Sequence, residues 1–188
     1  MADKLIRLLI LAGMMSMPQC VMGGATNAGA LPAPDSRTLL GVDEHIGSVI
    51  PADISFYDEK GAKRTLGEFV DRPTILALVF YHCPGICGMI QGNLAVTLKD
   101  VRRIAGKDYR VLSFSFDNEE TPDLAAEAFS NYTGIAGAAI PDGAWRFTTS
   151  DADNIKRMCD AVGFRYIKND THNFTHPALV TVLSRERK

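Results

Sequence analysis

The stretch that decides the fold is Thr74–Cys87, which reads TILALVFYHCPGIC. Its first seven residues are apolar or β-branched almost throughout, so they predict a buried strand over residues 74–80. Cys83 follows where the strand gives way to a helix, and Pro84 suits the first helical turn because its missing N–H needs no partner there. Cys87 lies four residues further on, one turn along the same face. Two sulfur atoms are therefore expected together at the start of a helix.

The position of this cysteine pair predicts its chemistry. The positive end of a helix lowers the pKa of a thiol and favours the thiolate, which attacks disulfides and binds soft metals. Cys83 and Cys87 therefore indicate redox or copper chemistry. The structural alternative is an inert disulfide, because neighbouring thiols normally pair in an oxidising compartment. With 4 cysteines in the whole chain, a scaffold held together by disulfides is not expected.

Length and composition set the class of the protein. A chain of 188 residues with 46% hydrophobic residues is long enough for one well-packed domain. The net charge is −2 and the basic residues are scattered, so the sequence gives no reason to expect nucleic-acid binding.

Residues 1–30 have the order of a secretory signal peptide. Lys4 and Arg7 precede an apolar segment over residues 8–17, and small residues ending in Ala28-Gly29-Ala30 offer a cleavage site. The apolar segment is too short for a good membrane span. We therefore expect export to the periplasm, with membrane attachment only through an uncleaved signal.

The remaining chain alternates strands and helices. Residues 31–48 are expected as an extended lead-in and residues 49–188 as the folded domain. A helix is expected over residues 86–104 after the cysteine turn. The other expected elements are strands at 109–116, 145–148 and 178–183 and helices at 121–132 and 151–162. This alternation predicts an α/β fold with a mainly parallel sheet flanked by helices. A cysteine pair at the first strand-to-helix junction makes the predicted fold thioredoxin-like.

Four segments carry a resemblance to a known family: FYHCPGIC, FSFDNEETP, DAVGFRY and FTHPALVTVLS. Over about residues 50–184 the chain resembles the SCO/SenC family of exported thioredoxin-fold proteins. The resemblance implies that Cys83, Cys87 and His176 bind copper and that Asp117 lies beside the metal. It implies delivery of copper to the CuA centre of cytochrome c oxidase, or reduction of that centre's cysteines. The implied partners are the CuA-bearing subunit or another copper chaperone, together with a thiol reductant.

The donor chemistry agrees with this resemblance. Two thiolates suit Cu(I), and an added imidazole gives a three-donor set that also holds Cu(II). Structural zinc takes four ligands, whereas only three good ligands are present here. Asp117 is expected to orient His176 or to tune the metal, and the alternative is a simple turn residue at the end of the strand. The alternative for His176 itself is a loop residue held by hydrogen bonds.

No direct metal-binding role is expected for the other histidines, acidic residues and cysteine near this motif or elsewhere in the domain. His82 is expected to point away from Cys83, as a surface residue or a modifier of the thiol pKa. His172 lies in the same polar loop as His176, and the spacing between the two histidines does not by itself indicate a role for His172. Glu119 and Glu120 are expected on a solvated face, and Cys159 in the core.

The same residues would also suit other functions. The main alternative is an exported thiol-disulfide reductase, with Cys83 and Cys87 as its redox-active pair. A copper or redox sensor would use the same residues. A peroxidase is less favoured, because the motif supplies neither a Thr or Ser beside the attacking cysteine nor a partnering arginine. A metallochaperone would not be an enzyme.

The sequence departs from the family pattern in two places. Gly88 follows the second cysteine where many relatives have proline. The sequence also ends at Lys188, where the family normally continues into another strand and a closing helix. We therefore expect an exposed sheet edge at the last strand.

Overall fold

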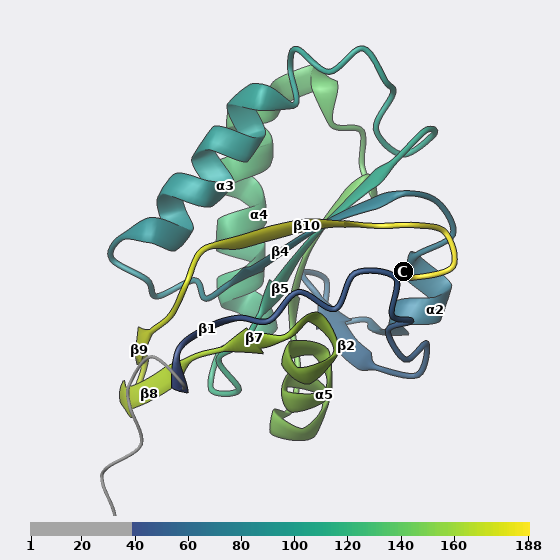
Figure 1. Cartoon of the computed structure of the whole chain (residues 1–188). Coiled ribbons are helices and arrows are strands. Elements are labelled where there is room, and N and C mark those ends of the chain that lie inside the picture. Colours follow the sequence, from purple (N-terminus) through teal and green to yellow (C-terminus); the bar gives the residue numbers. More distant parts are fainter. Residues whose placement is uncertain (1–38) are drawn as a thin grey trace, which may run out of the picture. The chain divides into compact units, whose positions relative to one another are not determined.

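The computed structural model describes residues 39–188 and is built around one six-stranded sheet (Figure 1). The expected signal peptide at 1–30 and residues 31–38 of the lead-in lie outside the described residues. The strand order is β10-β4-β5-β6-β2-β3. The strands are β2 (Ser55–Asp58), β3 (Lys63–Thr65), β4 (Thr74–Val79), β5 (Arg110–Ser115), β6 (Trp145–Thr149) and β10 (Leu179–Leu183).

The sheet is mixed, with a parallel centre and antiparallel edges. β4 pairs parallel with β5, and β5 pairs parallel with β6. The β10–β4, β2–β6 and β2–β3 pairings are antiparallel. β10 is the outermost strand, and its Val180 and Val182 are 46% and 63% exposed. Exposure alternates along β10, as in an antiparallel edge strand with one covered face, whereas β4 is buried along most of its length.

Helices lie on both faces of the sheet. α3 (Ile86–Thr97) and α4 (Pro122–Ala136) cover one face, and α5 (Ala152–Val162) belongs to the other. Within β5, Val111 joins the core on the α3–α4 side, while Leu112 joins the core that contains α5. This alternation follows from the two-residue period of a strand. The remaining helical elements are α2 (Leu66–Phe69) and the 3₁₀ turn η1 (Gly137–Ala139).

The helix starts follow local capping chemistry. A capping box begins α2, because the Thr65 hydroxyl accepts from the Glu68 amide while the Glu68 carboxylate accepts from the Thr65 amide. Asp151 caps α5 with its carboxylate. Thr121 precedes α4 with extended backbone, but its side chain makes no capping hydrogen bond.

α3 is shorter than expected. It ends at Thr97, whereas the apolar spacing predicted a helix to residue 104. Leu98 is still buried, but Val101 and Ile104 are 38% and 55% exposed. The apolar positions after Leu98 therefore do not extend the buried face of the helix, and spacing alone overestimated its length.

A second, two-stranded sheet ties the lead-in to the end of α5. β1 (Gly41–Val42) pairs antiparallel with β7 (Phe164–Arg165). Gly163 ends α5, with a left-handed φ of 67°. A Cβ atom at this position would lie 1.7 Å from the Asp43 carbonyl oxygen, so only glycine fits.

A β-hairpin replaces the polar loop expected before the last strand. β8 (Ile167–Asp170) pairs antiparallel with β9 (Asn173–Thr175). Phe174 anchors this hairpin, because its buried ring packs 5.0 Å from Phe80 and 5.4 Å from Phe116, measured between ring centroids. A single aromatic residue among polar neighbours gave no strand periodicity in the sequence.

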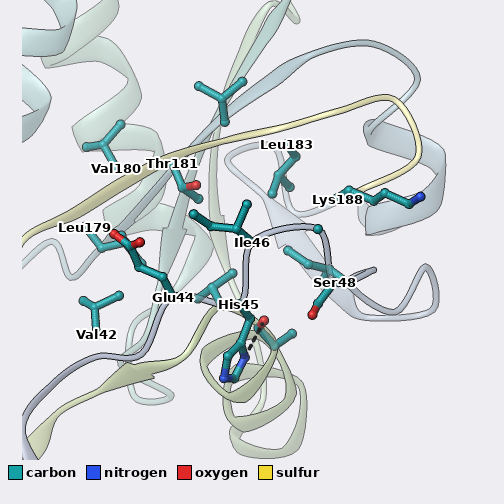
Figure 2. A pocket seen from close by; sticks show the side chains of 15 residues that line it. Val42, Glu44, His45, Ile46, Ser48, Leu179, Val180, Thr181, Leu183 and Lys188 are labelled. Carbon is teal, nitrogen blue, oxygen red and sulfur yellow. Dashed lines mark hydrogen bonds between the residues drawn. The ribbon is translucent and has the colours of Figure 1, made fainter.

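A groove of about 460 Å³ lies between the segment after β1 and strand β10 (Figure 2). Ile46, Leu179 and Val182 contribute apolar side chains to its wall. Its lining includes neither cysteine of the 83–87 pair. Across residues 39–188, no helix has the length and apolar character needed to cross a bilayer.

Candidate metal centre

Three segments distant in sequence meet at one edge of the sheet. β4 and β5 run in the same direction, with Val79 opposite Ser115, so the turns that follow both strands lie at this edge. β10 runs the other way, with Leu179 opposite Leu78, so the residues just before β10 arrive at the same edge. The carboxyl edge of parallel strands is a common place for ligand sites.

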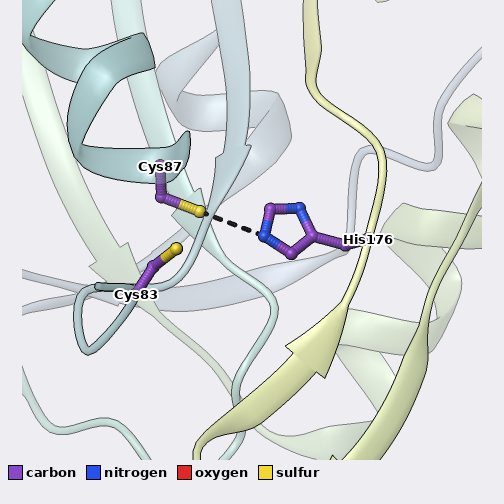
Figure 3. A group of neighbouring side chains, drawn as sticks. All are labelled: Cys83, Cys87 and His176. Atoms are coloured by element: carbon purple, nitrogen blue, oxygen red, sulfur yellow. Dashed lines mark hydrogen bonds between the residues drawn. The ribbon is translucent and has the colours of Figure 1, made fainter. Parts of the chain in front are cut away.

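The two cysteines approach from the turn and from the helix (Figure 3). Gly85 is the N-cap of α3, so Pro84 lies in the turn before the helix and not in its first turn as expected. Cys87 is in the first turn of α3, and Cys83 is in the preceding turn. One donor atom each from Cys83, Cys87 and His176 lie within 4.8 Å of one another. Both cysteines are free thiols.

His176 is oriented by its own backbone. Its Nδ1 lies 2.9 Å from the carbonyl oxygen of Pro177. A carbonyl can only accept, so Nδ1 carries the proton and the lone pair of neutral His176 is on Nε2. That Nε2 lies 3.5 Å from Sγ of Cys87. The imidazole therefore presents its lone pair to the cysteine pair, as metal-binding histidines do.

Aromatic rings confine His176. The centroid of its ring lies 5.5 Å from that of Phe80 and 5.1 Å from that of Phe116. The ring centroid of Phe164 lies 6.4 Å from that of His176, and the Phe116 side chain is buried, with 1% of the residue exposed. These contacts restrict the imidazole and exclude water from one side of the donor cluster.

Burial controls the ionisation of Cys87. The residue is 0% exposed, and this burial raises the pKa of its thiol well above the usual range. The expected lowering at the helix start is therefore wrong for Cys87, because desolvation by burial is the largest influence on its thiol pKa. Cys87 is thus a thiol that can donate to His176 Nε2, and a bound cation must displace that proton. Cys159 is a buried core thiol as expected, and burial raises its pKa to about 12.

Glu120 holds the turn that carries Cys83. Its carboxylate accepts from the backbone amides of Tyr81 and His82 at 2.6 and 2.8 Å and from the Ser115 hydroxyl at 2.6 Å. The residue is 6% exposed, so the expectation that it is solvated is wrong. The one sequence signal for this role is its place just after a strand that ends beside the cysteine turn.

Asp117 lies beside the centre but faces a different histidine. Its Oδ2 is 2.5 Å from Nδ1 of His172, while His176 bonds to a backbone carbonyl. The expectation that Asp117 orients His176 is therefore wrong. The reason is the β8–β9 hairpin, which brings His172 at its tip to the buried carboxylate. The hydrogen bond to Asp117 raises the pKa of His172. His82 joins this group, with its ring centroid 4.4 Å from that of His172.

Comparison with known proteins identifies the family. The model of the SCO1/SenC family matches residues 44–188. The chain belongs to the SCO1/SenC family. No curated protein matches this SCO1/SenC chain significantly.

Solved structures resemble this SCO1/SenC chain. A protein of Aquifex aeolicus VF5 described as a candidate electron transfer protein is 26% identical, with a TM-score of 0.64 over 76% of this chain and 80% of its own. Copper-bound ScoI of Arabidopsis thaliana is 19% identical, with a TM-score of 0.60 over 74% and 84%. BsSco, a cytochrome c oxidase assembly protein with a disulfide switch, is 16% identical, with a TM-score of 0.58 over 75% and 80%. These likenesses confirm the expected thioredoxin-like fold.

The donor set in this SCO1/SenC chain suits a soft transition-metal cation. Two sulfurs and one oriented imidazole nitrogen can converge on one ion, and partial burial protects them from water. The same two thiols are close enough for dithiol–disulfide chemistry. Among the described residues, the structure thus brings together the three candidate ligands named from the sequence.

Proposed function

We propose that this protein carries copper for assembly of the CuA centre of cytochrome c oxidase. Copper is its cargo, held as Cu(I) by Cys83 and Cys87 with His176 as the third donor. The observation that carries the proposal is the convergence of two sulfurs and the unprotonated Nε2 of His176 within 4.8 Å. Membership of the SCO1/SenC family and the copper-bound relative support it.

The unequal burial of the two cysteines gives a route for transfer. Cys83 is partly exposed, whereas Cys87 is buried beneath the turn. A partner thiolate can therefore reach the copper from the Cys83 side and exchange with that ligand first. The second ligand exchange then releases the ion. A disulfide between Cys83 and Cys87 is the copper-free form, so an external thiol reductant is required.

The proposed place of action is the periplasm. The basic start, apolar middle and small-residue exit of residues 1–30 support export. The proposed partner is the CuA-bearing subunit of the oxidase or another copper chaperone that meets the protein there.

A thiol-disulfide reductase is the second candidate, favoured by the same adjacent thiols. Because burial raises the pKa of Cys87, Cys83 would be the attacking thiol. Cys83 thiolate would form a mixed disulfide with the partner, and Cys87 would then displace the partner's thiol. The two electrons leave the Cys83–Cys87 pair as its disulfide forms, and the partner disulfide is reduced to a dithiol.

The test is delivery to a metal-free CuA domain. Copper-loaded wild-type protein is mixed with the reduced domain, and the CuA absorption spectrum is followed. The chaperone proposal predicts that CuA forms with wild type, fails with His176→Ala and proceeds normally with the exposed control His45→Ala. CuA formation that is unchanged in His176→Ala would contradict it. If copper-free protein reduced an oxidised CuA domain equally well in wild type and His176→Ala, the reductase would be supported instead.

A further inference from the structure

A second group of metal-ligating side chains lies next to the thiol centre. His82, Asp117 and His172 each offer one donor atom, and these atoms lie within 4.8 Å of one another. They come from the turn after β4, the end of β5 and the tip of the β8–β9 hairpin. We propose that they form a second metal site, for a divalent first-row transition-metal cation. This site uses none of the three donors of the proposed copper carrier.

The donor types determine which ion fits. Two imidazoles and a carboxylate suit Cu(II) and Zn(II), whereas Cu(I) prefers the neighbouring thiolates. Nitrogen and oxygen ligands at about 2.0–2.2 Å from one ion lie roughly 3–3.5 Å apart. A present spread of up to 4.8 Å can therefore close by side-chain rotation. If the cation takes both Asp117 Oδ2 and His172 Nδ1, it replaces the proton in the hydrogen bond between them.

Two of the three donors are already held in place. His82 Nδ1 lies 3.2 Å from Glu120 Oε1, so this ring can donate to the carboxylate and keep Nε2 free. A carboxylate behind the other ring nitrogen is the usual support of a metal-binding histidine. Asp117 is fully buried, and its backbone amide donates to the Ser115 hydroxyl at 3.1 Å.

The charge around the cluster favours a cation. Asp117, Glu119 and Glu120 surround the two histidines, and the neighbouring ammonium group is Lys168, which pairs with Glu119. Glu119 Oε2 is 3.8 Å from His172 Nε2. Three carboxylates against one ammonium leave an excess of negative charge at a partly buried place, which attracts divalent ions.

The structural alternative is that Asp117 and His172 only close the hairpin. His172 has a φ of 55° at the hairpin tip, and the hydrogen bond to Asp117 holds it there. This alternative needs only one histidine and predicts no metal affinity. A variant that keeps the hairpin but removes the imidazole of His172 distinguishes a metal site from a purely structural hydrogen bond.

The test uses Cu(II) with the thiol centre removed. In the Cys83→Ser/Cys87→Ser protein, Cu(II) is titrated, and electron paramagnetic resonance counts the coordinated nitrogens. We expect one Cu(II) per chain with two imidazole nitrogens. His172→Asn should weaken binding by at least about tenfold and leave one nitrogen, because asparagine tolerates positive φ but lacks the imidazole. His82→Ala should have a similar effect, and the exposed His45→Ala should have none.

Two results would overturn the proposal. One is the absence of Cu(II) binding by the folded double variant. The other is binding that survives His172→Asn and His82→Ala but disappears in His176→Ala, which would place the ion at the remnant of the thiol centre. Thermal unfolding of each metal-free variant checks its fold, and bound Cu(II) should raise the unfolding temperature only where the site is intact. Because the thiols are absent, this test is independent of copper delivery.

Discussion

Glu120→Ala tests whether a buried carboxylate holds the turn that carries Cys83. In the native structure this carboxylate accepts from two backbone amides of the turn, those of Tyr81 and His82, and from the Ser115 hydroxyl. Removing it leaves these donors without their acceptor. The hydroxyl already lies 3.5 Å from the carbonyl oxygen of Asp117 and can turn to it, so its loss is small.

The two backbone amides therefore determine how far Glu120→Ala lowers the free energy of unfolding. A buried donor without a partner costs about 1–3 kcal/mol, and the His82 amide is close enough to the surface to regain some hydration. We expect Glu120→Ala to lower the free energy of unfolding by about 2–4 kcal/mol. For a chain of this size, that corresponds to a fall of roughly 5–15 °C in the unfolding temperature.

The assay is thermal unfolding followed by circular dichroism, with the rate of Cys83 labelling as a local measure of the turn. Glu119→Ala is the matched control, because its carboxylate is exposed and pairs with Lys168 at the surface. Such a pair contributes at most about 1 kcal/mol. If Glu120→Ala unfolded within about 2 °C of Glu119→Ala, the role assigned to Glu120 would be refuted.

Three further predictions concern pH, thiol reactivity and packing. The hydrogen bond to Asp117 raises the pKa of His172, so this bond stabilises the fold below about pH 6.5 and the stabilisation is lost as pH rises through the raised pKa. In urea unfolding, the free energies of unfolding of wild type and His172→Asn should therefore differ more at about pH 5.5 than at about pH 8.5. An equal difference at both pH values would contradict this prediction. Alkylation followed by peptide mass spectrometry should label partly exposed Cys83 in the native protein and buried Cys159 only on unfolding, and equal rates would be inconsistent with the structure. Phe116→Ala should lower the free energy of unfolding by about 3–5 kcal/mol, because the buried ring of Phe116 packs among several aromatic rings. If urea unfolding showed a decrease of less than about 1 kcal/mol, that packing would be contradicted.

Local sequence patterns were enough to predict much of the fold and the two cysteine ligands of the candidate site. The apolar run at β4 and the cysteine motif after it located the centre, because a strand–turn–helix junction is built from neighbouring residues. The family resemblance added His176. Its approach to the cysteines depends on β10 running antiparallel to β4, which brings the residues before β10 to the edge where β4 ends.

What the sequence did not predict depends on contacts between distant residues. The β8–β9 hairpin forms where Phe174 finds Phe80 and Phe116, and only then does His172 reach Asp117. Glu120 looked solvated because its hydrogen-bond donors lie in a different turn. The raised thiol pKa of Cys87 has the same kind of origin, because burial in the surrounding core depends on residues distant in the sequence.

The most direct test of the account is a Cu(I) titration of the fully reduced protein against a chromophoric chelator. Wild type, Cys83→Ser, Cys87→Ser and His176→Ala are compared, with Cys159→Ser as the control thiol outside the centre. We expect one Cu(I) per wild-type chain, loss of binding in Cys83→Ser and in Cys87→Ser, weaker binding in His176→Ala and no change in Cys159→Ser. Folded, reduced wild-type protein that leaves all Cu(I) with the chelator would contradict it.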